Sequence, residues 1–187
     1  MRFIVGDLLD CPEADVIAHQ CNCLTVRGHG LAAAVARKYP AADCYTRRRP
    51  VSARKNLAAA DDRATPGTAS ILADGRVVAL FGQWRPGRIG APYFAAYPEY
   101  LALPETAEAR AVWFKAALED MIRQLPARTR PTLIGVPHLI GCDLAGGDWA
   151  TYLQMLVEFE QAHKDRVEIL VVRLPPIHQP SLKRARE

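Results

Sequence analysis

Residues 19–40, HQCNCLTVRGHGLAAAVARKYP, decide the fold because they join a predicted strand to a predicted helix through a glycine-containing turn. The preceding residues 14–18, ADVIA, are apolar and partly β-branched, which favours a buried strand, and residues 31–36 are rich in strong helix formers. Gly28 and Gly30 lie between them, where the lack of a Cβ lets backbone N–H groups approach an anion. The stretch therefore predicts a phosphate or diphosphate site, with a plain strand-to-helix turn as the alternative.

Three further stretches of the chain carry motifs that occur in a characteristic order together with residues 19–40. They are GDLL at 6–9, FGQWRPGRIG at 81–90 and GCDLAGGDW at 141–149. Together with His19, Asn22 and the two glycines, they resemble one branch of the macrodomain family, the ADP-ribose-binding fold. The FGQ segment in particular resembles the branch that processes ADP-ribose 1″-phosphate. The resemblance covers residues 1–173, and residues 174–187 are predicted to be a basic, flexible tail.

Alternating strand and helix patterns predict an α/β domain. Apolar positions repeat at helical spacing within 105–125 and after Trp149, and strands are expected at 2–5, 133–136 and 167–172. Asp74-Gly75 between two short apolar runs predicts a hairpin. The resemblance implies a three-layer α/β/α macrodomain whose mixed central sheet has about six strands.

Composition narrows the class of protein further. The 187 residues suit one domain, and the five cysteines include no CxxC pair, so neither a disulfide framework nor a zinc site is predicted. No run of apolar residues is long enough for a signal peptide or a membrane span. A net charge of +4 helps to gather anionic ligands without identifying nucleic acid as a partner. We expect a cytoplasmic monomer without metal or cofactor.

The resemblance also implies which residues bind the ligand. Asp7, in the turn after the first strand, would accept a hydrogen bond from the adenine amino group; the alternative role is a cap of that turn. The two glycine-rich loops would hold the diphosphate from both sides. The full predicted set is Asp7, Leu8, Asn22, Gly28, His29, Gly30, Leu31, Gln83, Gly141, Cys142, Asp143, Leu144, Ala145 and Gly146.

Two residues are candidates for acid–base catalysis. His19 follows a strand, and an ordinary histidine pKa near 6.5 allows proton transfer around neutral pH; a buried core histidine is the alternative. Asp148 follows two glycines at the start of a helix, where an N-cap is the simplest role. In the branch that the chain resembles, an aspartate of this motif lies near the terminal phosphate or ribose and works with the histidine.

A different branch of the family uses a lysine that opens the distal ribose. This chain has no lysine between Lys55 and Lys115, and Gln83 and Trp84 stand where that lysine would be. A lysine-dependent covalent route is therefore disfavoured. The predicted function is an ADP-ribose 1″-phosphate phosphatase or a related hydrolase that acts on phosphate-, protein- or nucleobase-linked ADP-ribose. The alternative is a non-catalytic module that binds free ADP-ribose or ADP-ribosylated protein or nucleic acid.

Some residues depart from the pattern of that branch. Thr25, Arg27 and His29 replace smaller or uncharged residues in the first loop, and Asp143 stands where glycine is usual, which would repel a diphosphate. The basic stretch 41–66 is predicted to be a solvated loop, with a flap that contacts polyanions as the alternative. Aromatic residues in 81–100, namely Trp84, Tyr93 and Phe94, would either pack in a local core or cover a sugar or base.

Overall fold

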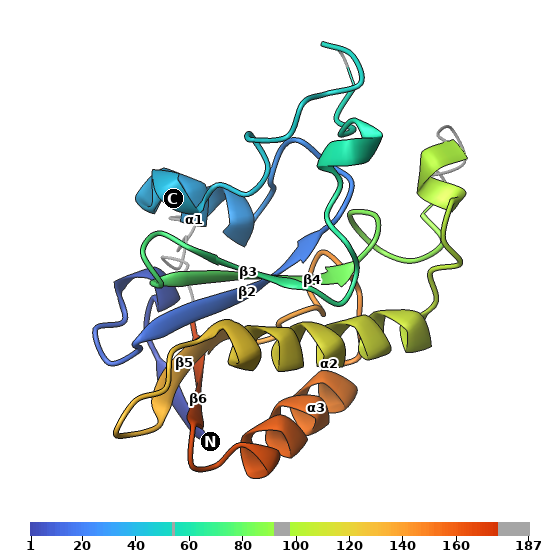
Figure 1. Cartoon of the computed structure of the whole chain (residues 1–187). Helices are drawn as coiled ribbons and strands as arrows, with labels where there is room; N and C mark the ends of the chain where they lie inside the picture. The colour runs from blue at the N-terminus through green and yellow to red at the C-terminus, as the bar shows by residue number, and fades with distance from the viewer. Residues whose placement is uncertain (54, 92–97, 176–187) are drawn as a thin grey trace, which may run out of the picture.

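The computed structural model describes residues 1–53, 55–91 and 98–175. A six-stranded sheet with the order β1-β6-β5-β2-β4-β3 forms the middle of the molecule (Figure 1). The strands are β1 (Arg2–Val5), β2 (Val16–Asn22), β3 (Ala69–Leu72), β4 (Val77–Gln83), β5 (Thr132–Pro137) and β6 (Val167–Arg173). The main helices are α1 (Leu31–Lys38), α2 (Ala107–Gln124) and α3 (Trp149–Ala162).

The sheet is mixed, as predicted. Neighbouring strands are parallel except for β3, which runs antiparallel to β4. The predicted hairpin joins these two: Leu72 pairs with Val77, and the Gly75 N–H donates to the Leu72 carbonyl at 3.2 Å. Every residue of β4 is buried, as expected for an apolar strand with neighbours on both sides.

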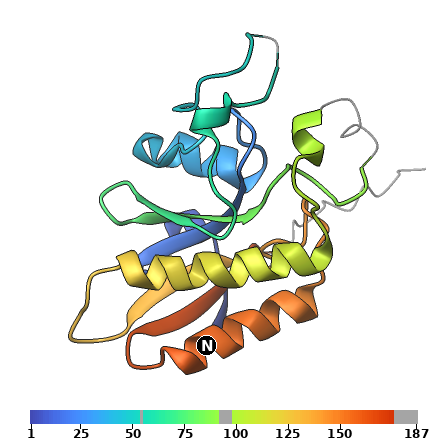
Figure 2. The ribbon, with the colours of Figure 1, turned by 45° about the vertical axis from the view of Figure 1, so that its right-hand side comes forward.

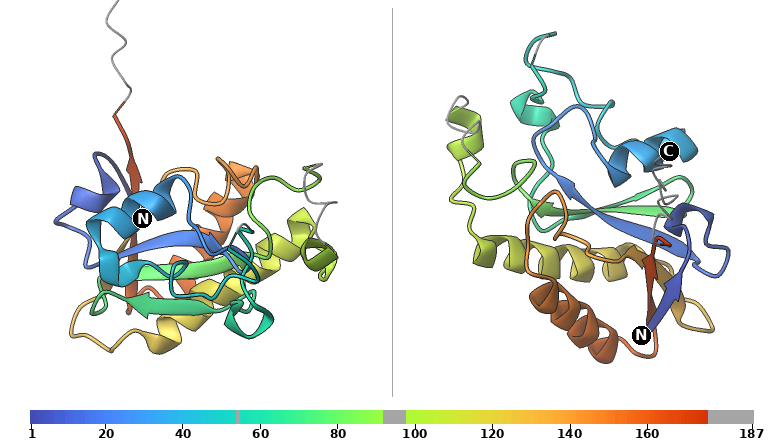
Figure 3. Two further views of the ribbon diagram at one scale, coloured as in Figure 1. Left: turned by 90° about the horizontal axis from the view of Figure 1, so that it is seen from above. Right: turned by 180° about the vertical axis from the view of Figure 1, so that it is seen from behind.

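Helices cover both faces of the sheet, which gives the predicted three layers (Figures 2 and 3). The side chains of β2 alternate between the faces. Ile17 packs in a cluster with Val35 of α1, whereas Ala18 packs in a cluster with Phe114 of α2 and Leu156 of α3. Because of this alternation, side chains two residues apart on β2 lie on the same face and can contact each other.

The strand predicted at 14–18 is longer in the structure, since β2 continues to Asn22. The extension pairs His19 with Ala79 and Asn22 with Gln83 across β4, with an irregularity in register between Gln20 and Asn22. His19 and Asn22 are therefore held by a sheet ladder rather than by a loop. The local sequence did not indicate this because the pairing depends on a strand more than fifty residues away.

The prediction of a solvated loop at 41–66 is wrong for much of that stretch. Leu57 and Tyr45 are buried, and Arg48 is 7% exposed. Arg49 pairs with Asp62 at 2.8 Å. The stretch forms a packed lobe beside the carboxyl end of β2. All three of its consecutive arginines bond within the lobe or to the first turn after β2, since Arg47 Nη2 also donates to the Ala41 carbonyl at 2.7 Å.

Trp84 lies in the local core, which was one of the two alternatives predicted for it. Its Nε1 donates to the Glu99 carbonyl at 3.1 Å. Tyr93 and Phe94 lie outside the described residues, as do 176–187 of the predicted tail. In the described part of the chain, no helix combines the length and the hydropathy that a membrane crossing needs.

Candidate functional site

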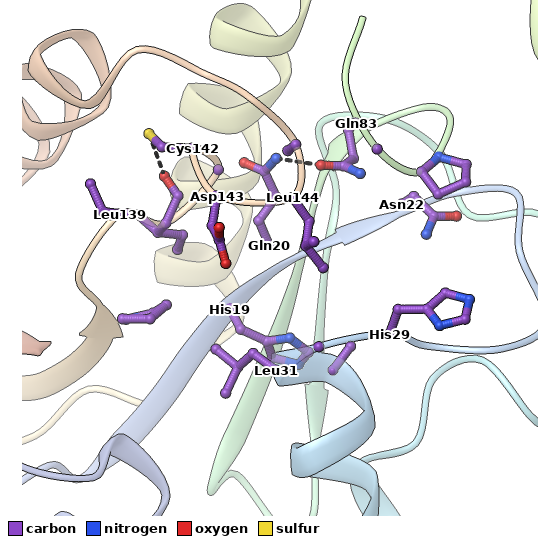
Figure 4. Close-up of a pocket in the computed structure, with 18 of the residues that line it drawn as sticks. His19, Gln20, Asn22, His29, Leu31, Gln83, Leu139, Cys142, Asp143 and Leu144 are labelled. Atoms are coloured by element: carbon purple, nitrogen blue, oxygen red, sulfur yellow. Dashed lines mark hydrogen bonds between the residues drawn. The ribbon is translucent and has the colours of Figure 1, made fainter. Parts of the chain in front are cut away.

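A cleft of about 630 Å³ opens at the carboxyl ends of three neighbouring parallel strands (Figure 4). The last residues of β2, β4 and β5, which are Asn22, Gln83 and Pro137, all line it. Residues 23–30, called the first loop here, and residues 138–147, called the second loop, contribute its walls. Ligands bind at this edge in open α/β sheets, and the volume suits a small organic ligand.

Most of the predicted ligand-binding residues, and the predicted catalytic residue His19, come together in this cleft. Those that line it are His19, Asn22, His29, Gly30, Leu31, Gln83, Gly141, Cys142, Asp143, Leu144 and Ala145. Five predicted residues do not: Asp7, Leu8, Gly28, Gly146 and Asp148.

Half of the residues that line the cleft were not predicted from the sequence. These residues are Gln20, Ala32, Tyr45, Pro86, Gly87, Arg88, Ala91, Pro137, His138, Leu139 and Ile140. Arg88 could have been predicted from the sequence, because it lies in the FGQWRPGRIG stretch. Tyr45 carried no signal, since it enters the cleft from the lobe formed by residues 41–66.

Unpaired backbone donors occupy two walls of the cleft. At the start of α1, the N–H groups of His29, Gly30, Leu31 and Ala32 have no backbone acceptor in the described part of the chain. Within the same described residues, the N–H groups of Asp143, Leu144 and Ala145 in the second loop also lack one. Two rows of donors, one of them at the positive end of a helix, favour an anion between them.

Asn22 organises the first loop. Its Oδ1 accepts bonds from the Leu24 and Thr25 N–H groups at 3.1 and 2.9 Å and from the Thr25 hydroxyl at 3.0 Å. Its own N–H and Nδ2 donate to the Tyr45 hydroxyl at 3.1 and 3.4 Å. Asn22 thus shapes the turn in addition to lining the cleft, and a direct ligand contact remains a prediction.

A buried arginine supports the first loop from below. Arg48 Nη1 donates to the carbonyls of Asn22 and Thr25 at 3.2 and 2.8 Å, and the guanidinium lies over the rings of Tyr45 and Phe81. No ion pair to this arginine exists among the described residues. Its positive charge, little exposed to solvent, therefore adds to the potential that favours an anion above the loop.

The two glycines of the first loop have different roles. At Gly28 a Cβ would lie 3.1 Å from both the Ala32 Cβ and the Tyr45 ring, so the residue allows close packing rather than access for a ligand. Gly30 has φ +55°, and a Cβ there would lie 2.9 Å from Leu144 Cδ1 of the second loop. The two loops therefore meet at Gly30, which needs glycine for its backbone conformation as well.

Glycine is also required in the second loop. Gly141 has φ +73°, and a Cβ would lie 2.2 Å from the Tyr152 ring of α3. Gly147 N–H donates to the Gly141 carbonyl at 3.0 Å and closes the loop on itself. The second loop is consequently a preformed turn anchored on α3.

His19 is 2% exposed and reaches the cleft from the α1 side of β2. Its Nδ1 lies 3.5 Å from Cys21 Sγ, because residues two apart on a strand share a face. Burial lowers the pKa of His19 to about 4. The expectation of an ordinary pKa near 6.5 is therefore wrong. The imidazole is neutral at pH 7, so a ring nitrogen can accept a proton, but the ring has no extra proton to donate.

A chain of amides crosses the floor of the cleft. Gln83 Nε2 donates to the Arg85 carbonyl at 3.1 Å, which directs its Oε1 toward Gln20. Gln20 Nε2 donates to that oxygen at 2.7 Å (Figure 4). The floor of the cleft is therefore made by two neutral amides that bond to each other.

A buried carboxylate connects this floor to the second loop. Glu105 has a fully buried side chain that pairs with Arg85 and Arg110, each at 2.8 Å, and accepts from the Trp84 N–H at 2.8 Å. Arg110 Nη1 in turn donates to the Ala145 carbonyl at 2.9 Å. The end of β4, the start of α2 and the second loop are thereby held in one arrangement.

The predicted residues outside the cleft have identifiable structural roles. Asp7 is exposed and accepts from the Leu9 N–H at 2.9 Å, as a cap of the turn after β1, and Leu8 is 4% exposed in the core. Gly146 has φ +71° and packs against the Arg88 side chain. Adenine contact by Asp7 remains a prediction, although its strand ends at the same edge of the sheet.

Asp148 is the N-cap of α3, which is the simplest role considered for it from the sequence. Its Oδ2 accepts from the Thr151 N–H and hydroxyl, both at 2.8 Å, and these bonds lower the pKa of the carboxyl. Oδ1 takes part in no bond within the described residues. A catalytic role for Asp148 would have to use this second oxygen.

Comparison with solved structures defines the fold. The macrodomain of Mycobacterium tuberculosis DarG superposes with a TM-score of 0.58 and 20% identity over 94% of this chain and 97% of that one. The macrodomain of Thermus aquaticus DarG gives 0.55 and 20% over 93% and 97%. The chain therefore has the macrodomain fold, and the resemblance found in the sequence is confirmed.

Two curated relatives match at the level of sequence, both named ADP-ribose 1″-phosphate phosphatase. The protein from Aspergillus oryzae is 49% identical over 42 residues, and that from Ajellomyces capsulatus is 51% identical over 39 residues. The matches span 22% and 21% of this chain and only 21% and 15% of those relatives. No family model matches the chain.

Proposed function

We propose that the cleft binds ADP-ribose, with the diphosphate between the first and second loops. The observation that carries this proposal is the pair of donor rows, at residues 29–32 and 143–145, which lie on walls that meet at Gly30 and Leu144. Backbone N–H groups bond strongly to phosphate oxygens because the acceptor is charged. The macrodomain fold and the names of the partial matches support the same ligand.

We further propose that the protein hydrolyses an ADP-ribosyl compound, with ADP-ribose 1″-phosphate as the first candidate. Water would replace the ester oxygen at phosphorus, and ADP-ribose and phosphate would leave. His19, neutral at pH 7, is proposed to accept the proton of the attacking water. Asp148 does not line the cleft but directly follows the second loop, and it is proposed to assist through Oδ1. No lysine lines the cleft in the described part of the chain, so a covalent lysine intermediate is not part of the proposal.

Turnover distinguishes the hydrolase from a module that only binds. The protein is incubated with ADP-ribose 1″-phosphate, ADP-ribosylated protein and ADP-ribosylated DNA, and released phosphate and ADP-ribose are measured. We expect phosphate from the first substrate. If calorimetry shows ADP-ribose binding but none of the three substrates is hydrolysed, the protein is a module that only binds. If it neither binds ADP-ribose nor hydrolyses any substrate, the proposed site is rejected.

A further inference from the structure

Three cysteines gather where the end of β2 passes beside the lobe formed by residues 41–66. Cys21 lies on β2, Cys23 follows it, and Cys44 comes from the lobe; all three thiols are free. The Sγ atoms of Cys21 and Cys44 are 3.9 Å apart. Cys21 is 1% exposed, whereas Cys44 is partly exposed.

Cys21 contacts a residue of the cleft through its sulfur, and Cys44 adjoins one in the chain. Cys21 Sγ is 3.5 Å from Nδ1 and 3.8 Å from Nε2 of His19. Cys44 directly precedes Tyr45, whose hydroxyl accepts from the Asn22 N–H at 3.1 Å. A change at Cys21 therefore acts directly on His19, and a shift of residue 44 acts on Asn22 through Tyr45.

The two thiols differ in pKa. Contact with the Cys21 thiol and the positive charge of Arg48 lower the pKa of Cys44. Burial raises the pKa of Cys21 well above its ordinary value. The thiolate is the nucleophile in cysteine oxidation, and Cys44 is also the more exposed of the two. We therefore expect Cys44 to react first and Cys21, 3.9 Å away, to resolve the product.

We propose that Cys21 and Cys44 are a modification site, a thiol pair that hydrogen peroxide converts to a disulfide, with an effect on the adjacent cleft. The Cys44 thiolate attacks one peroxide oxygen, the O–O bond breaks, and hydroxide leaves with a proton as water. Cys21 sulfur then attacks the sulfenic sulfur of Cys44, the S–O bond breaks, and a second water forms with the Cys21 proton. Two electrons pass from the thiols to the peroxide, which balances the reaction.

The disulfide requires a modest movement. An S–S bond is about 2 Å long, so the sulfurs must approach by about 2 Å from their present 3.9 Å. We expect this movement to come from rotation of the two side chains and a shift of residue 44. Oxidation removes the S–H group that faces His19 and draws residue 44 toward β2. Tyr45 and Asn22 must adjust with it, and the first loop with them. The effect on ligand affinity rests on the proposed function, whereas disulfide formation does not.

The test uses the full chain treated with hydrogen peroxide, followed by thiol counting and peptide mass mapping. We expect two thiols to be lost, a mass decrease of about 2 Da, a cross-linked peptide joining Cys21 and Cys44, and full reversal by dithiothreitol. The His19 imidazole resonance should shift on oxidation in the wild type but not in Cys44→Ser. Cys11→Ser, distant from the pair, is the control that should oxidise as the wild type does.

Specific outcomes would overturn the inference. A gain of about 16 or 32 Da on Cys44 without a cross-link would show that Cys21 does not resolve it. Faster oxidation at Cys142, or an unshifted His19 resonance in the cross-linked protein, would also contradict it. Reduced protein that fails to bind ADP-ribose would reject the proposed function and leave the thiol result standing.

Discussion

Arg110 Nη1 donates to the carbonyl of Ala145 at 2.9 Å and so joins the first turn of α2 to the second loop of the cleft. The same guanidinium pairs through Nε with the buried Glu105. Arg110→Gln should lower the free energy of unfolding by about 3 kcal/mol, because it leaves a buried carboxylate with one partner fewer. Denaturant unfolding at pH 7 measures this change.

Arg123→Gln is the matched control for that substitution. Arg123 also forms an ion pair on α2, with Asp120, but its side chain is 66% exposed. Its loss should cost under about 1 kcal/mol. Equal effects of the two substitutions would show that the Glu105 network contributes no more than a surface pair.

The stability of the domain should fall between pH 7 and pH 5 through His19. The folded-state pKa of about 4 lies below that of the unfolded chain, so only the unfolded state gains a proton in this window. The free energy of unfolding should drop by about 2 kcal/mol on this account and recover as pH rises above 6.5. His19→Phe should remove this pH dependence of stability. The control His29→Gln, at an exposed position, should leave it unchanged. An imidazole resonance of His19 that titrates near pH 6.5 would contradict the argument.

Two charged side chains at the cleft should act on affinity in opposite directions. Arg88 and Asp143 are exposed and line the cleft, so Arg88→Gln should weaken ADP-ribose binding and Asp143→Asn should strengthen it. Each effect should be about 1 kcal/mol or less, roughly fivefold in Kd, and should shrink with added salt. Adenosine, which lacks the diphosphate, serves as the uncharged comparison in calorimetry. Equal changes for both ligands would place neither charge near the diphosphate.

Asp148 can be tested for its two roles separately. Asp148→Ala removes the cap of α3 and should cost about 1 kcal/mol of stability. Asp148→Asn keeps an oxygen for the Thr151 donors and should cost less, yet it removes the charge that the proposed hydrolysis uses. We expect turnover of ADP-ribose 1″-phosphate to fall about 10²-fold or more in Asp148→Asn. Unchanged turnover would leave Asp148 with its capping role alone.

Asp7 offers a test of ligand orientation. If its carboxylate meets the adenine, Asp7→Ala should weaken ADP-ribose and adenosine binding but spare ribose 5-phosphate. The turn should loosen slightly, because the Leu9 N–H loses its acceptor. Asp7→Asn preserves that cap and is the control for stability. A uniform loss for all three ligands would assign Asp7 to the fold rather than to recognition.

The regular elements followed closely from local pattern. β1 has the predicted bounds, and β3 and β4 form the predicted hairpin, because apolar runs and the Asp74-Gly75 turn are encoded by adjacent residues. α2 starts two residues later than the apolar pattern indicated, where Thr106 accepts from the Ala109 N–H at 3.1 Å. The glycine turns before α1 and α3 were also evident, since their residue types are required locally.

The sequence by itself determined the α/β class, the order of its elements and the two loops that face the cleft, since these depend on periodicity and on glycine. Tertiary structure alone decided the protonation of His19, the burial of Arg48 beneath the first loop and the contact between Cys21 and Cys44. Each of these depends on segments distant in the chain that come together only on folding. A pKa or a hydrogen bond is set by such neighbours, and no local pattern records them.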